Sequence, residues 1–329
     1  MRLLPVFVFV NLYRSAQAVA GASGDNMIDW QSAADAAKAA TEPGSLDVPA
    51  AEREAYARDV REARDAIRTV SGAEFDVPDT IEIQNRHHWI DANIATFERV
   101  MGTLESQVQT GTFPGVARTV NTGTMTVLLA FLGRNVLGQY DPLLLAETPA
   151  DDHALYFVRP NILNAAEKLD VDADRFRRWI AFHEVTHAAE FGAAPWLSDH
   201  LETRMEDGIA ALSDGSFNRA SFRELDAAMT VVEGYAELLM DHAFDDEYAD
   251  LRRKLDERRQ GRGPLQQLFR RLLGLGLKER QYKRGKNFFE DVVSARDLET
   301  ASLVWEGPAY LPTHDELDEP ELWLRRVDR

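Results

Sequence analysis

The sequence predicts a mainly α-helical protein with a small β-sheet or hairpin just ahead of one distinctive helix. Long stretches repeat apolar residues with the helical period, whereas short apolar runs separated by turn residues are concentrated between residues 137 and 160. A chain of 329 residues that is 45% hydrophobic can bury a substantial core, and its 13 Pro and 20 Gly are scattered without an internal repeat. We therefore predict a single domain over residues 27–329.

Three helices are predicted in the first part of the chain. Asp47 and Pro49 open the first helix, and Ser71 and Gly72 close it, because Pro suits the first turn of a helix and Gly suits its exit. The predicted helices cover residues 52–70, 88–101 and 123–137.

Two short strands are predicted after these helices. Residues 138–140, 142–145 and 155–158 are short apolar or aromatic runs separated by turn residues, and we interpret them as two short strands. A helix over residues 175–191 is expected to follow, because its apolar residues recur at helical spacing and Gly192 and Pro195 supply the end. The strands therefore come just ahead of this helix in the chain.

The helix over residues 175–191 carries His183, Glu184 and His187, which form the motif H-E-x-x-H. Residues at i and i+4 share one face of a helix, so both imidazoles can bind one Zn2+ ion. Glu184 lies beside them, where a carboxylate can act as the general base that takes a proton from water. The competing interpretation is a core helix whose histidines bond only to neighbouring residues.

A zinc site of this kind requires a third ligand. The metzincin continuation H-x-x-G-x-x-H is excluded, because Glu190 and Ala193 stand where its Gly and its third His belong. Glu233 fits the gluzincin pattern of a later Glu, since a carboxylate inside an apolar helix is costly unless it is paired or binds metal. His200 is the rival third ligand.

Glu237 follows Glu233 by one helical turn. We predict that its carboxylate accepts the second ring N–H of a ligand His. An exposed acidic pair without metal is the alternative interpretation of these two residues. Because the chain has no Cys, only His and carboxylates remain as good zinc ligands.

Several further segments occur in a fixed order around these residues. They are residues 85–93 (NRHHWIDAN), 137–142 (LGQYDP), 158–161 (VRPN), 183–187 (HEVTH), 195–197 (PWL), 232–237 (VEGYAE) and 277–282 (LKERQY). With this pattern the chain resembles the zincin-like metallopeptidase family whose members are labelled coenzyme F-420 (deazaflavin) biosynthesis-associated. The resemblance covers about residues 28–323, nearly the whole chain.

The resemblance implies a zincin-like fold of the gluzincin type, with one Zn2+ per chain. It implies that His183, His187 and Glu233 are the ligands and that Glu184 is the base. It implies no known substrate, and the link to deazaflavin coenzyme metabolism rests on the label alone. Tyr235 stands where relatives often carry His.

The function that this predicts is metal-assisted hydrolysis. A peptide or amide-containing substrate is expected by analogy with other sites of this type. The group that stabilises the oxyanion stays open on residue type, and the candidates are Tyr235, His200, His242, Tyr282 and a nearby Arg. The rival hypothesis is a catalytically silent zinc-binding assembly or binding factor, in which four protein ligands would close a structural site.

The charge of the chain bears on its environment and partners. The net charge is −18, and Lys is rare, with six Lys against 31 Arg. Such an acidic surface stays hydrated when salt screens charge, so we interpret it as halophilic adaptation, with ordinary acidity as the simpler alternative. Nucleic acid is not expected as a partner, and no protein partner can be named.

Residues 252–286 are the exception, with 13 Lys and Arg against three acidic residues. An apolar stripe at helical spacing from Leu265 to Leu273 can pack on the protein itself, or it can contact a membrane surface, an acidic partner or an anionic substrate. Stable membrane insertion is not expected. Near the end of the chain, Thr313 and Glu316 have capping-box spacing, which predicts a docked helix through Trp323.

Residues 1–26 differ in character from the rest of the chain. Arg2, the apolar run over residues 3–10 and the small residues that follow resemble a secretory signal, although the run is too short to span a bilayer as a helix. The family resemblance begins directly after Met27. We therefore expect an over-extended gene start and a cytoplasmic protein, with export as the alternative.

Overall fold

The computed structural model describes residues 27–75, 77–78, 80–107, 114–141, 154–213, 219–244, 250–254 and 275–328. These residues form a mostly helical structure with one three-stranded sheet, which confirms the predicted fold class. The elements are α2 Trp30–Ala39, α3 Ala50–Ser71, β1 Thr80–Gln84, α4 Arg86–Gln107, α5 Pro114–Asn135, β2 Gly138–Asp141, β3 Ala154–Val158, α6 Arg159–Leu169, α7 Ala173–Ala193, α8 Leu197–Ser213, α9 Arg219–Ala243, α12 Leu275–Ala295, α13 Leu298–Ser302, the 3-10 turns η1 Leu303–Trp305 and η2 Pro308–Tyr310, and α14 Pro320–Val327. Residues 1–26, the apolar run over residues 142–145 and the stripe over residues 265–273 lie outside the described residues.

The predicted ends of α3 are confirmed. Pro49 is its N-cap, and Gly72 ends it in the left-handed conformation with φ of 67°, which Gly adopts without a steric cost. The next helix, α4, starts earlier than predicted because Asn85 caps it, with the His88 amide donating to Asn85 Oδ1 at 3.0 Å. The helix after it, α5, also starts earlier, at Pro114.

The two predicted strands, β2 and β3, are present and pair antiparallel. A third strand, β1, pairs parallel with β3, so the strand order is β1-β3-β2 and β3 lies in the middle. We did not predict β1, although residues 80–84 (TIEIQ) alternate in polarity as a strand does. We also did not predict α6, which separates the sheet from α7 along the chain.

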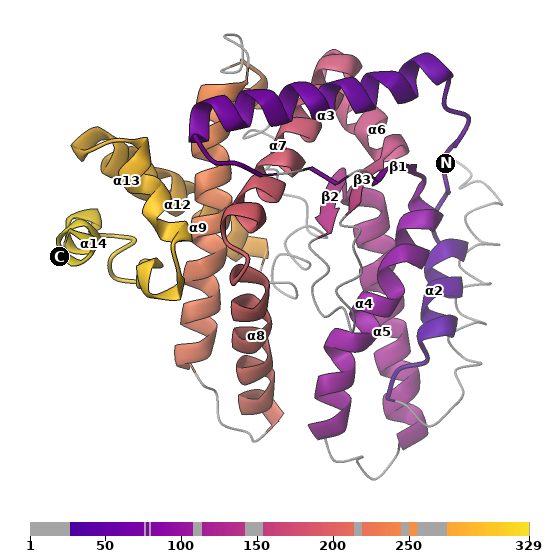
Figure 1. The fold of residues 1–329 in the computed structure, drawn as a ribbon. Coiled ribbons are helices and arrows are strands. Elements are labelled where there is room, and N and C mark those ends of the chain that lie inside the picture. The colour runs from indigo at the N-terminus through magenta and orange to yellow at the C-terminus, as the bar shows by residue number, and fades with distance from the viewer. Residues whose placement is uncertain are drawn as a thin grey trace, which may run out of the picture.

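The helices are arranged in two groups joined by the sheet. Figure 1 shows α8, α9, α12, α13 and α14 on one side and α2, α4 and α5 on the other, with α3 crossing above both. Each group has its own cluster of buried apolar residues. Strand β3 contributes Leu155 and Phe157 to the larger cluster and Val158 to the smaller one, so the central strand connects the two.

Polar side chains from residues 85–93 tie these parts together. Arg86 Nε donates to Asn161 Oδ1 at 2.7 Å, and its Nη1 donates to the carbonyl of Glu42 at 3.0 Å. Asn161 in turn donates to the carbonyls of Gly133 and Val136 at 2.9 and 2.7 Å. This segment therefore has a structural role, because its hydrogen bonds to Asn161, most of them at least partly buried, connect α4, α6 and the end of α5.

Two glycines allow α9 and α12 to cross in close contact. A Cβ added at Gly234 would lie 2.4 Å from the carbonyl carbon of Gly285, and one added at Gly285 would lie 2.2 Å from the carbonyl oxygen of Thr230. Real Cβ atoms do not approach other atoms this closely, so both positions require Gly.

The C-terminal capping pair is present but opens a turn instead of a helix. The Thr313 amide donates to Glu316 Oε2 at 2.8 Å, and the Glu316 amide donates to Thr313 Oγ1 at 3.3 Å, but residues 314–318 form turns. The helix begins at Pro320, and its Trp323 is fully buried, as expected of a docked segment.

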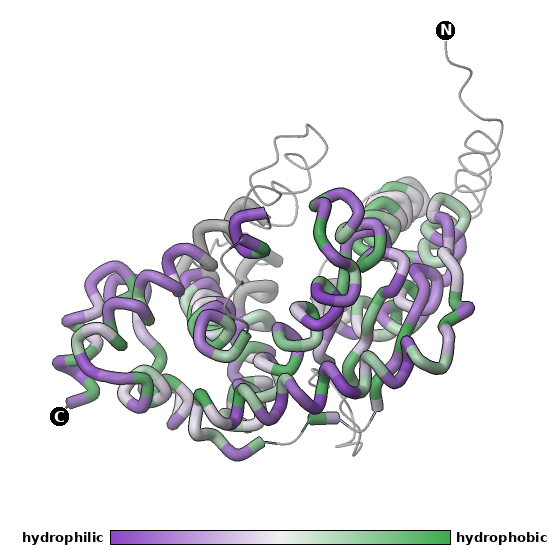
Figure 2. The backbone as a smooth tube through the Cα atoms, turned by 90° about the horizontal axis from the view of Figure 1, so that it is seen from above, coloured by the Kyte–Doolittle hydropathy of each residue, from purple (hydrophilic) through white to green (hydrophobic). Residues whose placement is uncertain are grey.

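No helix among the described residues is both long enough and apolar enough to cross a bilayer. Figure 2 shows that hydrophilic and hydrophobic residues alternate along the helices, and the hydrophilic residues keep their mean hydropathy low.

Candidate metal centre

Helix α7 supplies most of the site. Asp172 caps its start by accepting from the Arg175 amide at 2.8 Å, and the helix packs against α3, α9 and β2. Residues 176–190 are largely buried, as the apolar stripe predicted. The histidines of the motif therefore lie on a helix that is fixed on several sides.

His183 and His187 of α7 meet Glu233 of α9. The potential ligand atoms of these three residues all lie within 4.8 Å of one another. The two imidazole rings are 4.7 Å apart at an interplanar angle of 77°, and the carboxylate of Glu233 is buried, with 5% of the residue exposed. The structure thus brings together the three residues predicted as ligands.

His187 is oriented by a carboxylate that sequence reasoning did not propose. Its Nδ1 lies 2.8 Å from Oε2 of Glu190, a fully buried residue one turn further along α7. In the neutral imidazole with its proton on Nδ1, that proton is donated to Glu190, and Nε2 keeps the lone pair that a metal ion could take in place of a second proton.

The charges around His187 are unusual for a buried position. Burial alone would lower the pKa of His187, but Glu190, Glu233 and Glu184 outweigh it and raise the pKa to about 9. Burial raises the pKa of Glu190 to about 7, although His187 opposes this effect. Three carboxylates thus place negative charge around one imidazole, and a divalent cation would offset that charge.

His183 is held by an aromatic contact. Its ring stacks on the indole of Trp179 with a centroid distance of 5.6 Å and an interplanar angle of 12°. Trp179 stacks in turn on Phe176 at 5.8 Å, so three successive turns of α7 support the first histidine.

Glu184, the predicted base, contacts strand β2. Its Oε2 accepts a hydrogen bond from the Tyr140 amide at 2.9 Å, and the residue is 7% exposed. The strand approaches α7 this closely because residue 138 is Gly. A Cβ added there would lie 2.7 Å from Glu184 Oε1 and 2.8 Å from Ile180 Cγ2.

Glu237, predicted to support a ligand His, is buried one turn after Glu233. Its Oε2 accepts from Arg252 Nη2 at 2.8 Å, and Arg252 also pairs with Asp241. Lys286 pairs with Asp241 at 3.1 Å. Two cations of the basic segment are therefore bound to acidic residues of α9.

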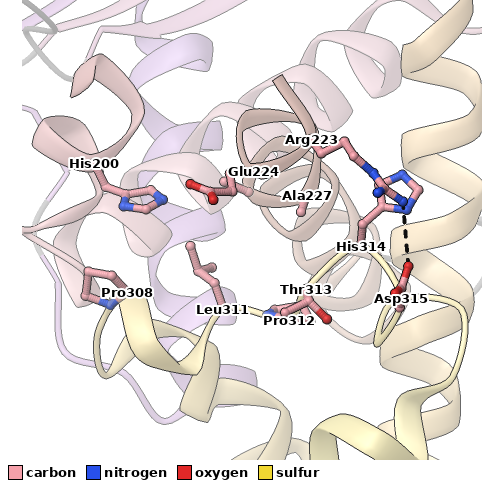
Figure 3. Close-up of a pocket in the computed structure, with 11 residues that line it drawn as sticks. His200, Arg223, Glu224, Ala227, Pro308, Leu311, Pro312, Thr313, His314 and Asp315 are labelled. Carbon is pink, nitrogen blue, oxygen red and sulfur yellow. Dashed lines mark ion pairs between the residues drawn. The ribbon is translucent and has the colours of Figure 1, made fainter. Parts of the chain in front are cut away.

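His200, the rival ligand, lies in a separate pocket of about 430 Å³. Figure 3 shows its ring beside Glu224 and Leu311, at the opposite end of the pocket from Arg223 and His314. Burial lowers the pKa of His200, and its ring packs edge-on against Trp196. The close group of ligand atoms in the described part of the chain contains Glu233 and not His200.

Two candidates for the oxyanion group are engaged elsewhere. The Tyr235 hydroxyl lies 2.8 Å from Ser302 Oγ, and burial raises the pKa of Tyr235 to about 12. Its ring packs edge-on against Phe289 and Trp305. His242 lies within 2.8 Å of the carbonyl of Leu238 through Nδ1. The side chain of Tyr282 lies outside the described residues.

The donor set fits a zinc ion. Two imidazole nitrogens and one carboxylate oxygen are the ligands found in open zinc sites of the His2Glu type. Glu190 fixes the ring proton of His187, and carboxylates surround the ligands with negative charge. The described structure is thus a helical protein in which His183, His187 and Glu233 could hold a metal ion in the zincin manner.

The comparisons with known proteins agree with this class. The model of the family described as zincin-like metallopeptidase matches residues 28–216 and 204–324. The chain belongs to this family. No curated protein matches it.

A crystal structure from Chloroflexus aurantiacus, described as a candidate hydrolase with a novel fold, is similar to this chain at a TM-score of 0.73 and 30% identity. The similarity covers 97% of this chain and 98% of that chain. Family and structural relative together support a hydrolase, and the deazaflavin link appears in neither comparison.

Proposed function

We propose that this protein is a zinc-dependent hydrolase that cleaves a peptide or amide bond. In this proposal His183, His187 and Glu233 hold one Zn2+ ion, and Glu184 is the general base. The observation that carries it is the meeting of two imidazoles from α7 with a buried carboxylate from α9, beside a second carboxylate of the same motif.

When bound, zinc supplies Lewis-acid polarisation of a carbonyl group and of water. Glu184 takes the proton from the attacking water and later delivers it to the leaving nitrogen. The Tyr140 amide donates to Oε2 of Glu184 and so holds the carboxylate in place for this proton transfer. Glu190 keeps the ring of His187 in one tautomer, and Trp179 holds the ring of His183 in place.

The finer features of the proposal rest on the sequence. A role in deazaflavin coenzyme metabolism, a cytoplasmic location, a high-salt environment and the absence of a nucleic-acid partner remain parts of it. Residues 27–329 are proposed to act as one domain, and Glu237 is proposed to support a ligand His. The substrate class follows from analogy with other sites of this kind.

The test is an unbiased cleavage screen of peptides and metabolites in high salt with the zinc-loaded protein. Any turnover found should fall by about 100-fold or more in Glu184→Gln, because general-base catalysis contributes about that much. A matched control is Glu167→Gln, an exposed carboxylate on α6, which should keep the wild-type rate. A wild-type rate in Glu184→Gln would remove the hydrolase and leave a zinc-binding assembly or binding factor.

A further inference from the structure

We propose that strand β2 is a positioning device for Glu184, in which the Tyr140 amide holds the carboxylate and Gly138 is the residue that permits the contact. The proposal rests on the proposed function, because it assigns Glu184 the role of base. It makes Gly138 and the Tyr140 backbone positioning groups, which act on the reaction through Glu184.

The direction of the Tyr140 amide follows from the register of the sheet. Gly138 pairs with Phe157 and Tyr140 pairs with Leu155, while the Val158 amide donates to the carbonyl of Leu137 at 2.9 Å. In an antiparallel pair, alternate residues point their backbone groups toward the partner strand and away from it. Gly138 and Tyr140 therefore point away from β3, toward α7.

Helix α7 occupies the place that a further strand would take beside β2. The carboxylate of Glu184 accepts the hydrogen bond that a neighbouring strand's carbonyl would otherwise accept. The Tyr140 amide on the outer side of β2 is thus satisfied by the residue proposed as the base. A peptide substrate cannot use the Tyr140 amide for strand pairing while this bond is present.

The close approach depends on Gly138. Its added Cβ would lie 2.7 Å from Glu184 Oε1, 2.8 Å from Glu184 Cγ and 2.8 Å from Ile180 Cγ2. Ile180 is buried in the core, so the clash cannot be relieved on that side. Any side chain at position 138 would move either the strand or the Glu184 carboxylate.

The strand is also fixed on its other side. Trp89 Nε1 donates to Gln139 Oε1 at 2.9 Å, and Gln139 Nε2 donates to Asn93 Oδ1 at 3.0 Å. The ring of Tyr140 packs against Phe191 with a centroid distance of 5.7 Å. Because α4 and α7 both hold β2, the strand cannot slide, and the Tyr140 amide defines a fixed point for the base.

Residue-resolved hydrogen exchange tests the contact without any metal. The backbone amide of Tyr140 should exchange at least about 10-fold faster in Glu184→Ala and in Gly138→Ala than in the wild-type protein, because both variants lose its hydrogen bond to a charged group. The backbone amide of Gln139 points toward β3, so its exchange rate should not change. An unchanged Tyr140 amide in Glu184→Ala would overturn the proposal, even if Gly138→Ala failed to fold.

A double-mutant cycle tests the role of the contact between β2 and Glu184. The probe is acetohydroxamate, which chelates zinc and also forms a hydrogen bond to a carboxylate beside the metal. Gly138→Ala and Glu184→Gln should each weaken binding to the zinc-loaded protein by about 10-fold with full zinc content, and the double variant should lose no more than either. Fully additive losses, or wild-type binding by Gly138→Ala, would overturn the proposal.

The control is Gly115→Ala, because an added Cβ there meets no atom within 4 Å. It should match the wild-type protein in both measurements. If the wild-type protein bound neither zinc nor the probe, the hydrolase proposal would fail, and the exchange rates would still decide whether Gly138 and Tyr140 hold Glu184.

Discussion

The orientation of His187 depends on Glu190, a carboxylate that lies on the same helix and is buried with it. A buried carboxylate is costly unless it is hydrogen-bonded, and here the bond is to the imidazole of His187, the proposed ligand. One helix can therefore carry both the proposed ligand and the carboxylate that would fix its tautomer.

Changing Glu190 to Gln should weaken zinc affinity by about 10- to 100-fold, because the imidazole loses the charged partner that orients it and makes it more basic. Competition against a chelator of known affinity measures this. The same titration of Glu237→Gln tests the other carboxylate proposed to support a ligand, for which we expect a loss of about the same size. Wild-type affinity in Glu190→Gln would show that the Nδ1 contact does not tune the ligand.

Zinc content distinguishes the ligands from the base. The wild-type protein should bind about one equivalent of zinc. His187→Ala and Glu233→Ala should lose most of it, because each removes a donor, whereas Glu184→Gln should keep it. Elemental analysis after dialysis measures the content. Full zinc in Glu233→Ala would contradict the assignment of Glu233 as a ligand.

The residues of the motif could be predicted because their spacing is local. His183, Glu184 and His187 lie within two turns of one helix, so helical geometry alone places them together. Glu190 could have been found in the same way, as an acidic residue in an apolar stretch three positions after His187. The Tyr140 contact could not, since it joins a backbone amide to a side chain 44 residues away.

The segments differ in how well their ends could be predicted. Helix α3 follows its capping residues, Pro49 and Gly72, because these act on the local backbone. Strand β1 pairs with β3, which lies over 70 residues later in the chain. Its alternating pattern alone could not predict a strand, because the strand forms only with this distant partner. The Thr313 box forms as predicted, but Pro320 starts the helix.

The C-terminal segment should lose stability in acid. Burial alone would raise the pKa of Glu316, but Arg326, at 2.7 and 2.9 Å, and the Thr313 amide outweigh it, so the pKa lies below its ordinary value of 4.5. A lowered pKa means that the ionised carboxylate stabilises the fold. This contribution is complete above pH 4.5 and is lost as pH falls through the lowered pKa.

Glu316→Gln should therefore lower the free energy of unfolding by about 1 to 3 kcal/mol at pH 7, and the difference should shrink below pH 4.5. Urea unfolding of both proteins at pH 7 and below pH 4.5 measures this difference. Glu306→Gln is the control, because that carboxylate is exposed and should show little effect at either pH. A difference independent of pH would mean that the ionised form of Glu316 contributes nothing.

At the scale of the whole molecule, the net charge of −18 sets the response to salt. Like charges repel in the folded state, and the screening length falls from about 10 Å at 0.1 M salt to about 3 Å at 1 M. We expect the unfolding temperature to rise by at least about 2 °C between these KCl concentrations, which corresponds to roughly 1 kcal/mol.

Calorimetry measures this shift. The triple variant Glu98→Gln, Glu167→Gln and Glu306→Gln removes three exposed negative charges and should show a smaller rise. A fall in the unfolding temperature with KCl would contradict the halophilic interpretation of the surface.

The arrangement of whole helices was the least predictable level. That α7 and α9 lie side by side, with Glu233 against the histidines, depends on packing between segments about 50 residues apart. Sequence reasoning selected Glu233 by its type and by the family pattern, and only the three-dimensional structure places it within reach of His183 and His187.

The contact between Gly234 and Gly285 links the packing of α12 on α9 to the position of Glu233 in the candidate metal centre. Gly234 directly follows Glu233, so α12 touches α9 beside the residue proposed as the third zinc ligand. Any side chain at position 285 would push the helices apart and would shift Glu233 relative to α7 without touching the metal centre. Relatives that keep the ligand must therefore keep a small residue on a different helix, about 50 positions away in the sequence.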